Sequence, residues 1–157
     1  MNILVTGGAG YIGSHTAHLL AEQGFHVTVL DNLSTGFRWA VPEQATFYQA
    51  DVGDTGKVHE VLTNERIDAV IHFAASIDAA ESVLDPLKYY GNNTTKTIAL
   101  LRALQEANVK KLIFSSTAAV YGDTQDLPVK EETPIQPISP YGWSKAMSEQ
   151  VIQDLGK

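Results

Sequence analysis

Tyr141 and Lys145 form the residue pair with the clearest chemical potential in this sequence. They lie four positions apart in a segment with a helical pattern, so both side chains fall on one face of that helix. A free tyrosine has a pKa of about 10 and is a weak base at neutral pH. A neighbouring ammonium group favours the phenolate and lowers that pKa. The pair therefore suits removal of a proton from an alcohol, although an isolated match to this spacing also fits an exposed surface pair.

Hydroxyl side chains at Ser115, Ser116 and Thr117 follow a short apolar run. A hydroxyl group at the end of a strand could hydrogen-bond a substrate oxygen and direct the proton that Tyr141 removes. A solvated turn is the alternative interpretation of the same three residues. Their occurrence in the same chain as the Tyr141 and Lys145 pair favours a catalytic role.

Three glycines, Gly7, Gly10 and Gly13, are spaced G-x-x-G-x-x-G between a predicted strand and a predicted helix. Gly7 would permit a tight turn, Gly10 would let a pyrophosphate approach the backbone, and Gly13 would allow close packing of the helix. The N-terminus of the helix offers N–H groups and a partial positive charge to the anion. A P-loop is excluded because no Gly-Lys-Ser or Gly-Lys-Thr follows. The motif predicts a dinucleotide site, with a glycine turn that binds nothing as the alternative.

Asp31 follows the second predicted strand, 18 residues after Gly13. A carboxylate there can accept both ribose hydroxyls of adenosine and would repel a 2′-phosphate, so NAD is favoured over NADP. Asp51 ends the third predicted strand and could hydrogen-bond adenine while Val52 packs on the ring. Both aspartates also fit ordinary turns, because Asp side chains bond their own backbone there.

The composition excludes several other classes of protein. The chain has 157 residues, 44% of them hydrophobic, no cysteine and a net charge of −7. Disulfides, thiolate zinc sites and cysteine nucleophiles are therefore absent, and the acidic balance disfavours nucleic-acid binding. His15 and His18 lie three residues apart without further ligands nearby, so no metal site is predicted. Residues 1–21 carry no charge but lack a basic start and are interrupted by glycines, which fits neither a signal peptide nor a membrane span.

The elements that must position these residues alternate between strand and helix. Strands are expected at residues 3–5, 27–30, 45–50, 69–73 and 111–115, and helices at residues 11–23, 55–64, 86–108 and 141–155, with loops at residues 32–42 and 116–140. This alternation predicts an α/β fold, a doubly wound, Rossmann-like parallel sheet with helices on both faces. The first strand should be central, with the second and third on one side and the fourth and fifth on the other. We expect residues 1–157 to form one NAD-binding domain, with its ligand at the carboxyl ends of the strands.

Several segments together resemble the extended short-chain dehydrogenase/reductase family. They are the glycine motif, Asp31-Asn32, His72-Phe73-Ala74-Ala75, Tyr89-Tyr90-Gly91-Asn92-Asn93, Ser115-Ser116-Thr117 and Tyr141-Gly142-Trp143-Ser144-Lys145. Within the family the likeness is strongest to the epimerases that act at C4 of UDP-sugars. It implies a tightly held NAD as resident oxidant, Tyr141 as the base for the sugar 4-hydroxyl with help from Thr117, and Lys145 as the holder of the nicotinamide ribose.

The resemblance also implies the set of residues that contact NAD. They are Gly7, Gly10, Tyr11, Ile12, Gly13, Asp31, Asn32, Ser34, Asp51, Val52, Phe73, Ala74, Ala75, Asn92, Ser115, Tyr141 and Lys145. Two departures stand out: Ile77 occupies a position where many relatives carry a lysine, and Thr117 one where serine is frequent. Sugar-nucleotide dehydratases usually follow that threonine with Asp-Glu, and here it is followed by Ala118 and Ala119, which disfavours dehydration.

The same resemblance implies that family members need further carboxyl-terminal strands and a smaller substrate domain, which these 157 residues lack. We therefore expect the amino-terminal part of an enzyme about twice as long, cytoplasmic and able to form a homodimer. Two alternatives stay open: an NAD-binding module that is inactive on its own, and a related sugar-nucleotide reductase or epimerase.

Overall fold

A computed structural model describes residues 1–125 and 127–156 of the chain. The chain forms two compact units. The first comprises residues 1–75 and 99–115, and the second comprises residues 76–98 and those from 116 onward.

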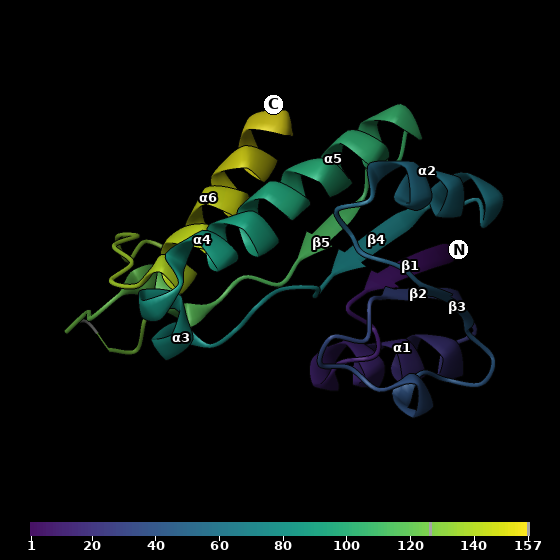
Figure 1. Ribbon diagram of the computed structural model, residues 1–157, viewed down its shortest axis with the longest axis horizontal. Coiled ribbons are helices and arrows are strands. Elements are labelled where there is room, and N and C mark those ends of the chain that lie inside the picture. The colour runs from purple at the N-terminus through teal and green to yellow at the C-terminus, as the bar shows by residue number, and fades with distance from the viewer. Residues whose placement is uncertain (126, 157) are drawn as a thin grey trace. The chain divides into compact units, whose positions relative to one another are not determined.

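The first unit is built on a five-stranded sheet in which all neighbouring strands are parallel. The strands are β1 (Asn2–Thr6), β2 (His26–Asp31), β3 (Thr46–Gln49), β4 (Ala69–His72) and β5 (Leu112–Phe114). Their order is β3-β2-β1-β4-β5, which confirms the predicted central position of the first strand (Figure 1). Because all strands run the same way, their carboxyl ends share one edge of the sheet.

Helices cover both faces of this sheet, as the alternating pattern predicts (Figure 1). One face carries α1 (Tyr11–Glu22), and the other carries α2 (Thr55–Asn64) and the part of α5 (Lys96–Glu106) that belongs to this unit. Side chains along β1 point alternately to the two faces of the sheet, and so contribute to two separate hydrophobic cores. Ile3 and Val5 pack in the cluster that includes Ala17 of α1, so Leu4, which is fully buried, faces the opposite layer.

The α1 face of the sheet is covered over β1 and β2 but open over β5. Ile113 of β5 is 64% exposed. An apolar groove of about 460 Å³ lies beside it and is also lined by Ile71 of β4 and by Leu20 of α1.

The ends of the helices follow local sequence signals. Gly24 stops α1 with a left-handed φ of +81°, and the N–H of Phe25 then bonds the carbonyl of Leu20 at 3.1 Å. In the second unit, Ser139 caps α6 by accepting the N–H of Gly142 at 3.1 Å, with Pro140 as the first helical residue. Both boundaries confirm the sequence-based predictions.

The second unit is helical. It contains α3 (Ala79–Leu84), α4 (Pro86–Tyr89), the π-helical turn η2 (Tyr90–Thr95), the 3₁₀ turn η3 (Ala118–Tyr121) and α6 (Pro140–Leu155). Helix α6 packs against α3, α4, η2 and η3. It therefore forms the centre of this unit.

The helical stretch predicted over residues 86–108 is present from Pro86 to Glu106, but it is not one regular α-helix. The chain forms α4, widens into η2 and resumes as α5, which ends at Glu106. The widened turn has the sequence Tyr-Gly-Asn-Asn-Thr-Thr, and these residues have low helix propensity. The predicted loops at residues 32–42 and 116–140 contain two short 3₁₀ turns, η1 (Arg38–Ala40) and η3.

Helix α3 was not predicted from the sequence. Asp78 begins it by accepting the N–H of Glu81 at 2.9 Å, a capping signal that precedes only six helical residues. In the described part of the chain, no helix combines the length and the apolar character that crossing a membrane requires.

Candidate active site

The glycine turn between β1 and α1 is sterically closed at two of its three predicted positions. Gly7 has a φ of +71°, and a Cβ there would lie 2.6 Å from the backbone nitrogen of Ala74. A Cβ on Gly13 would lie 2.2 Å from the carbonyl oxygen of Gly7. Gly10 differs, because its Cβ would meet only that same oxygen, at 3.3 Å. Gly7 and Gly13 thus close the turn as predicted, and Gly10 leaves open space beside the backbone.

The N-terminus of α1 is not capped by any side chain within the described residues. Four other helices, α2, α3, α4 and α6, do begin with a capping side chain: Asp54, Asp78, Asp85 and Ser139. The first residues of α1, Tyr11 and Ile12, are 81% and 60% exposed. The first-turn N–H groups of α1 therefore present a partial positive charge at the carboxyl edge of the sheet.

Asp31 joins the end of β2 to the glycine turn. Its Oδ2 accepts the N–H of Ala9 at 3.0 Å, and its Oδ1 accepts the N–H of Leu33 at 2.8 Å. The residue is 8% exposed. The turn role that the sequence left open is thus present. A carboxylate has about four acceptor positions, so two remain for a ligand.

Asp51 is bonded in a similar way after β3. Its Oδ1 accepts the N–H of Gly53 at 2.8 Å, and its Oδ2 accepts the side-chain amide of Asn32 at 3.0 Å. Asn32 in turn accepts the N–H of Ser34 at 2.9 Å. Val52 beside Asp51 is buried. The polar residues predicted to surround an adenosine are therefore already linked to one another.

The ends of β4 and β5 complete this edge of the first unit. The N–H of Phe73 donates to the carbonyl of Thr6 at 2.9 Å, and the N–H of Ser115 donates to the carbonyl of His72 at 3.1 Å. Phe73, Ala74 and Ala75 are half-buried and lead out of β4 beside Gly7. The structure thus gathers the predicted cofactor residues of the first unit along one edge.

The histidines have structural contacts. His72 is buried, and its Nδ1 lies 2.6 Å from the Thr6 hydroxyl. His15 packs its ring against that of Tyr11, and His18 bonds the carbonyl of Ala40 at 3.2 Å. Among the described residues, no group of three or more potential metal ligands gathers.

Tyr141 lies near the start of α6, and its ring packs edge-on against that of Tyr89 with centroids 6.3 Å apart. Tyr89 is fully buried and donates to Glu81 at 2.7 Å. Burial and this hydrogen bond raise the pKa of Tyr89 to about 12. Tyr89 therefore stays protonated at neutral pH and holds the aromatic wall against which Tyr141 rests.

Lys145 lies one turn further along α6 and is 4% exposed. Burial lowers its pKa from 10.5 to about 8, and the negative charge of Glu149 acts in the opposite direction. A lysine in such surroundings is uncommon, because removing an ammonium group from water is unfavourable.

Thr117 stands at the start of η3, where its hydroxyl oxygen accepts the N–H of Ala119 at 3.2 Å. The preceding hydroxyl, Ser116, donates to a carboxylate oxygen of Glu149 on α6. The turn interpretation of this segment is thus correct for Thr117, and the hydroxyl proton of Thr117 stays available for another acceptor.

An asparagine network in the second unit was missed by sequence reasoning. The side chain of Asn93 bonds both the N–H and the carbonyl of Ser76, at 2.8 and 3.0 Å, and its amide also donates to the Ser144 hydroxyl at 2.9 Å. Asn92, predicted to contact the cofactor, donates to the Ser76 hydroxyl at 3.0 Å. Ser144 lies between Tyr141 and Lys145, so this network fixes the helix that carries both. Its signal in the sequence is the pair of consecutive asparagines, which also ends one of the segments that carry the family resemblance.

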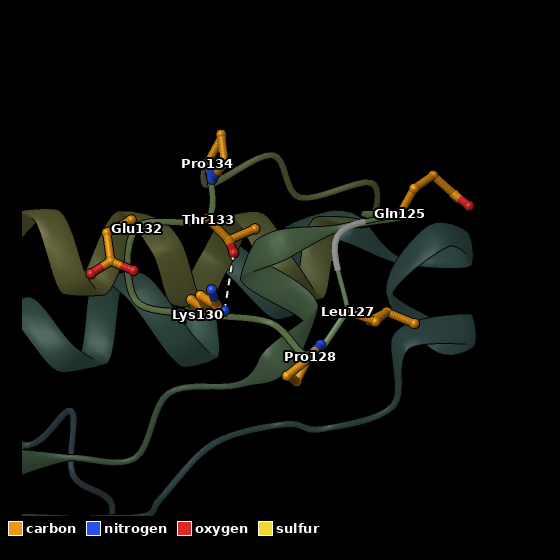
Figure 2. A pocket seen from close by; sticks show the side chains of 7 residues that line it. All are labelled: Gln125, Leu127, Pro128, Lys130, Glu132, Thr133 and Pro134. Atoms are coloured by element: carbon orange, nitrogen blue, oxygen red, sulfur yellow. Dashed lines mark hydrogen bonds between the residues drawn. The ribbon is translucent and has the colours of Figure 1, made fainter.

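A hollow of about 450 Å³ also lies in the loop before α6 (Figure 2). It is lined by Gln125, Leu127, Pro128, Lys130, Glu132, Thr133 and Pro134. Figure 2 shows the N–H of Lys130 bonded to the Thr133 hydroxyl, and most of the other side chains spread outward. The lining includes none of the predicted site residues.

Comparisons with known proteins identify similar chains. The sequence profile of the NAD dependent epimerase/dehydratase family matches residues 3–157. A UDP-glucose 4-epimerase from Lactobacillus helveticus is 54% identical over 97% of this chain and 46% of its own length. UDP-arabinose 4-epimerase 1 from Arabidopsis thaliana is 46% identical over 99% of this chain and 39% of its own.

A solved structure has the same fold. The UDP-glucose 4-epimerase of Brucella ovis, crystallised in complex with NAD, is 46% identical and superposes with a TM-score of 0.95. The match covers 98% of this chain and 47% of that one. The chain therefore spans a little under half the length of the relatives it matches.

Proposed function

Because the chain belongs to the NAD dependent epimerase/dehydratase family, we propose that the protein containing it is an NAD-dependent 4-epimerase of UDP-sugars. The reaction is the interconversion of UDP-glucose and UDP-galactose through a 4-keto sugar. The 54% identity to a UDP-glucose 4-epimerase supports this assignment. The relative named for UDP-arabinose shares the position of the reaction, C4, and differs in the sugar.

The residues of the first unit fit NAD. The glycine turn leaves space at Gly10, the uncapped start of α1 suits a pyrophosphate, and Asp31 keeps free acceptor positions for ribose hydroxyls. We propose that residues 1–157 act as the NAD-binding domain and that the contacts predicted from the sequence hold this cofactor. When bound, NAD supplies reversible hydride acceptance from the sugar carbon.

Three side chains of the second unit are proposed to act on the substrate. Tyr141 removes the proton of the sugar 4-hydroxyl and later returns it. The Thr117 hydroxyl donates a hydrogen bond to the sugar 4-oxygen and keeps its own proton, which stabilises that oxygen as its charge changes. Lys145 places a positive charge that favours the phenolate of Tyr141 and bonds the ribose next to the nicotinamide. Ala118 and Ala119 after Thr117 carry only methyl groups, so they provide no acid or base for dehydration.

The burial of Lys145 is the observation that carries this proposal. A surface Tyr–Lys pair, the alternative interpretation of the spacing, would leave the ammonium in water, whereas Lys145 is 4% exposed. A buried ionisable group with a displaced pKa is typical of functional sites.

The complete protein should carry NAD after purification and convert UDP-galactose to UDP-glucose. The NAD content is measured by heating the protein to release the cofactor and assaying the NAD enzymatically. Turnover is measured by separating the two nucleotide sugars. The 157-residue chain alone should retain at most the NAD and turn over neither sugar, because the relatives are about twice as long. Absence of both NAD and turnover in the complete protein would contradict the proposed function.

Replacing Asp31 with asparagine should weaken NAD binding by at least about tenfold, because a hydrogen bond to a charged acceptor contributes about 1.5–3 kcal/mol. Asparagine keeps the size of the side chain and one acceptor oxygen for the backbone. Titration of the cofactor-free protein with NAD measures the effect. Asp68→Asn is a matched control, since Asp68 also accepts a backbone N–H, from Asn2 at 2.8 Å, but lies before β4. Equal affinity of the two variants would refute the ribose assignment.

We also propose that the protein is a homodimer in the cytoplasm. Trp143 and Met147 lie four residues apart on α6 and are 44% and 43% exposed, so α6 offers apolar side chains to a second copy.

A further inference from the structure

Glu149 is a carboxylate that the proposed reaction does not use, yet it lies among the groups that do. It follows Lys145 by four residues on α6, so the two side chains share one face of the helix. Its carboxylate is partly buried and accepts the Ser116 hydroxyl. Ser116 immediately precedes Thr117, so Glu149 connects the Thr117 turn to the helix of Tyr141 and Lys145.

The charge of Glu149 matters because Lys145 is buried. Burial lowers the pKa of Lys145 to about 8, and Glu149 raises it. A lysine whose pKa is close to the ambient pH is only partly charged. An uncharged amine does not stabilise a neighbouring tyrosine phenolate. A group that keeps Lys145 protonated therefore helps Tyr141 to act as the base.

The elements packed against α6 carry other titratable groups. These are Glu81 on α3, Lys88 and Tyr89 on α4, Tyr90 on η2 and Tyr121 on η3, besides Tyr141 and Asp154 on α6 itself. Glu81 is bound by Lys88 and Tyr89. The negative charge of Glu149 raises the pKa of Lys145.

We propose that Glu149 is a positioning residue of the candidate site, whose carboxylate fixes the Ser116 hydroxyl and keeps the Lys145 ammonium charged. The proposal rests on the proposed function for its consequence in turnover, but not for its effect on Lys145 itself. Glu149 positions Thr117 through Ser116, because the Ser116 hydroxyl is bonded to Glu149 on α6 and Ser116 directly precedes Thr117.

The test uses Glu149→Gln in the complete protein, since glutamine keeps an acceptor oxygen for Ser116 and removes the charge. The pKa of Lys145 should fall by about one pH unit, because the opposite charge that raises it on the same helix face is lost. NMR titration of ¹³C-labelled lysine side chains, with the Lys145 signal assigned through Lys145→Met, measures this without any reaction. Glu149→Asp should restore the pKa, and Asp154→Asn, which removes another carboxylate of α6, should leave it unchanged.

The kinetic consequence is a change in the pH profile. The alkaline limb of kcat should move to lower pH by the same amount, and kcat at pH 7.5 should fall about threefold with little change in KM, following the protonated fraction of Lys145. An unaltered Lys145 pKa in Glu149→Gln overturns the inference. A lowered pKa in a protein that epimerises no UDP-sugar supports the inference and refutes the proposed function instead.

Discussion

Tyr141→Phe in the complete protein should reduce kcat for UDP-galactose by about 10³-fold or more. The substitution removes only the phenolic oxygen that we propose as the base, and positioned acid–base groups typically contribute 10²–10⁴-fold. The phenylalanine ring can keep its edge-on contact with Tyr89, so the fold and the NAD content should match those of the unaltered protein. Steady-state turnover together with NAD quantification measures the two properties separately.

Tyr48→Phe is the matched control for this variant. This substitution removes the Tyr48 hydroxyl on β3, which donates to Glu65 at 2.6 Å. Tyr48 belongs to the first unit and to no proposed reaction step. Its turnover should stay within about twofold of the unaltered protein, because the lost hydroxyl takes part in no proposed reaction step. Retained turnover in Tyr141→Phe would show that another group removes the proton.

The fold of the first unit could be predicted because its signals are local. Short apolar runs separated by helical patterns give a parallel sheet, and the glycine spacing fixes the first turn. Gly13 illustrates this, since its role as a closely packed glycine followed from its position alone, and a Cβ there would overlap the carbonyl of Gly7. The predicted strand order followed from the general rule for doubly wound sheets.

The second unit was harder to predict because its contacts join residues distant in the sequence. Asn93 reaches Ser144 across 51 positions, and Ser116 reaches Glu149 across 33. No periodicity encodes such pairs. The sequence correctly placed Tyr141 and Lys145 on one helix, but it could not reveal that the lysine is buried. Burial depends on the packing of α3, η2 and η3 around α6.

Lys145→Met should stabilise the cofactor-free protein at pH 7 by about 3 kcal/mol while reducing turnover. The buried ammonium is destabilising, since a fall of its pKa from 10.5 to about 8 corresponds to about 3 kcal/mol. Methionine has a similar shape and needs no hydration. Urea denaturation of the cofactor-free complete protein measures the change.

The stabilisation should depend on pH in a defined window. Below about pH 8, Lys145 is charged in both the folded and the unfolded chain, so the full penalty is present in the unaltered protein. Between about pH 8 and 10.5 the folded chain releases the proton first, and the stability of the unaltered protein rises relative to the variant. Above that range the two proteins should differ little. Lys57→Met on α2, where the lysine is paired with Glu60 at the surface, is the matched control and should change the stability at pH 7 by no more than about 0.5 kcal/mol.

A gain of stability together with a loss of turnover in Lys145→Met would show that Lys145 has a functional role and not a structural one. A buried charge that weakens the fold persists only where its chemistry is needed, and functional sites commonly show this trade-off. If Lys145→Met instead destabilised the protein at pH 7, the ammonium would be a structural group held by its neighbours. The burial of Lys145 would then no longer support its assignment beside Tyr141.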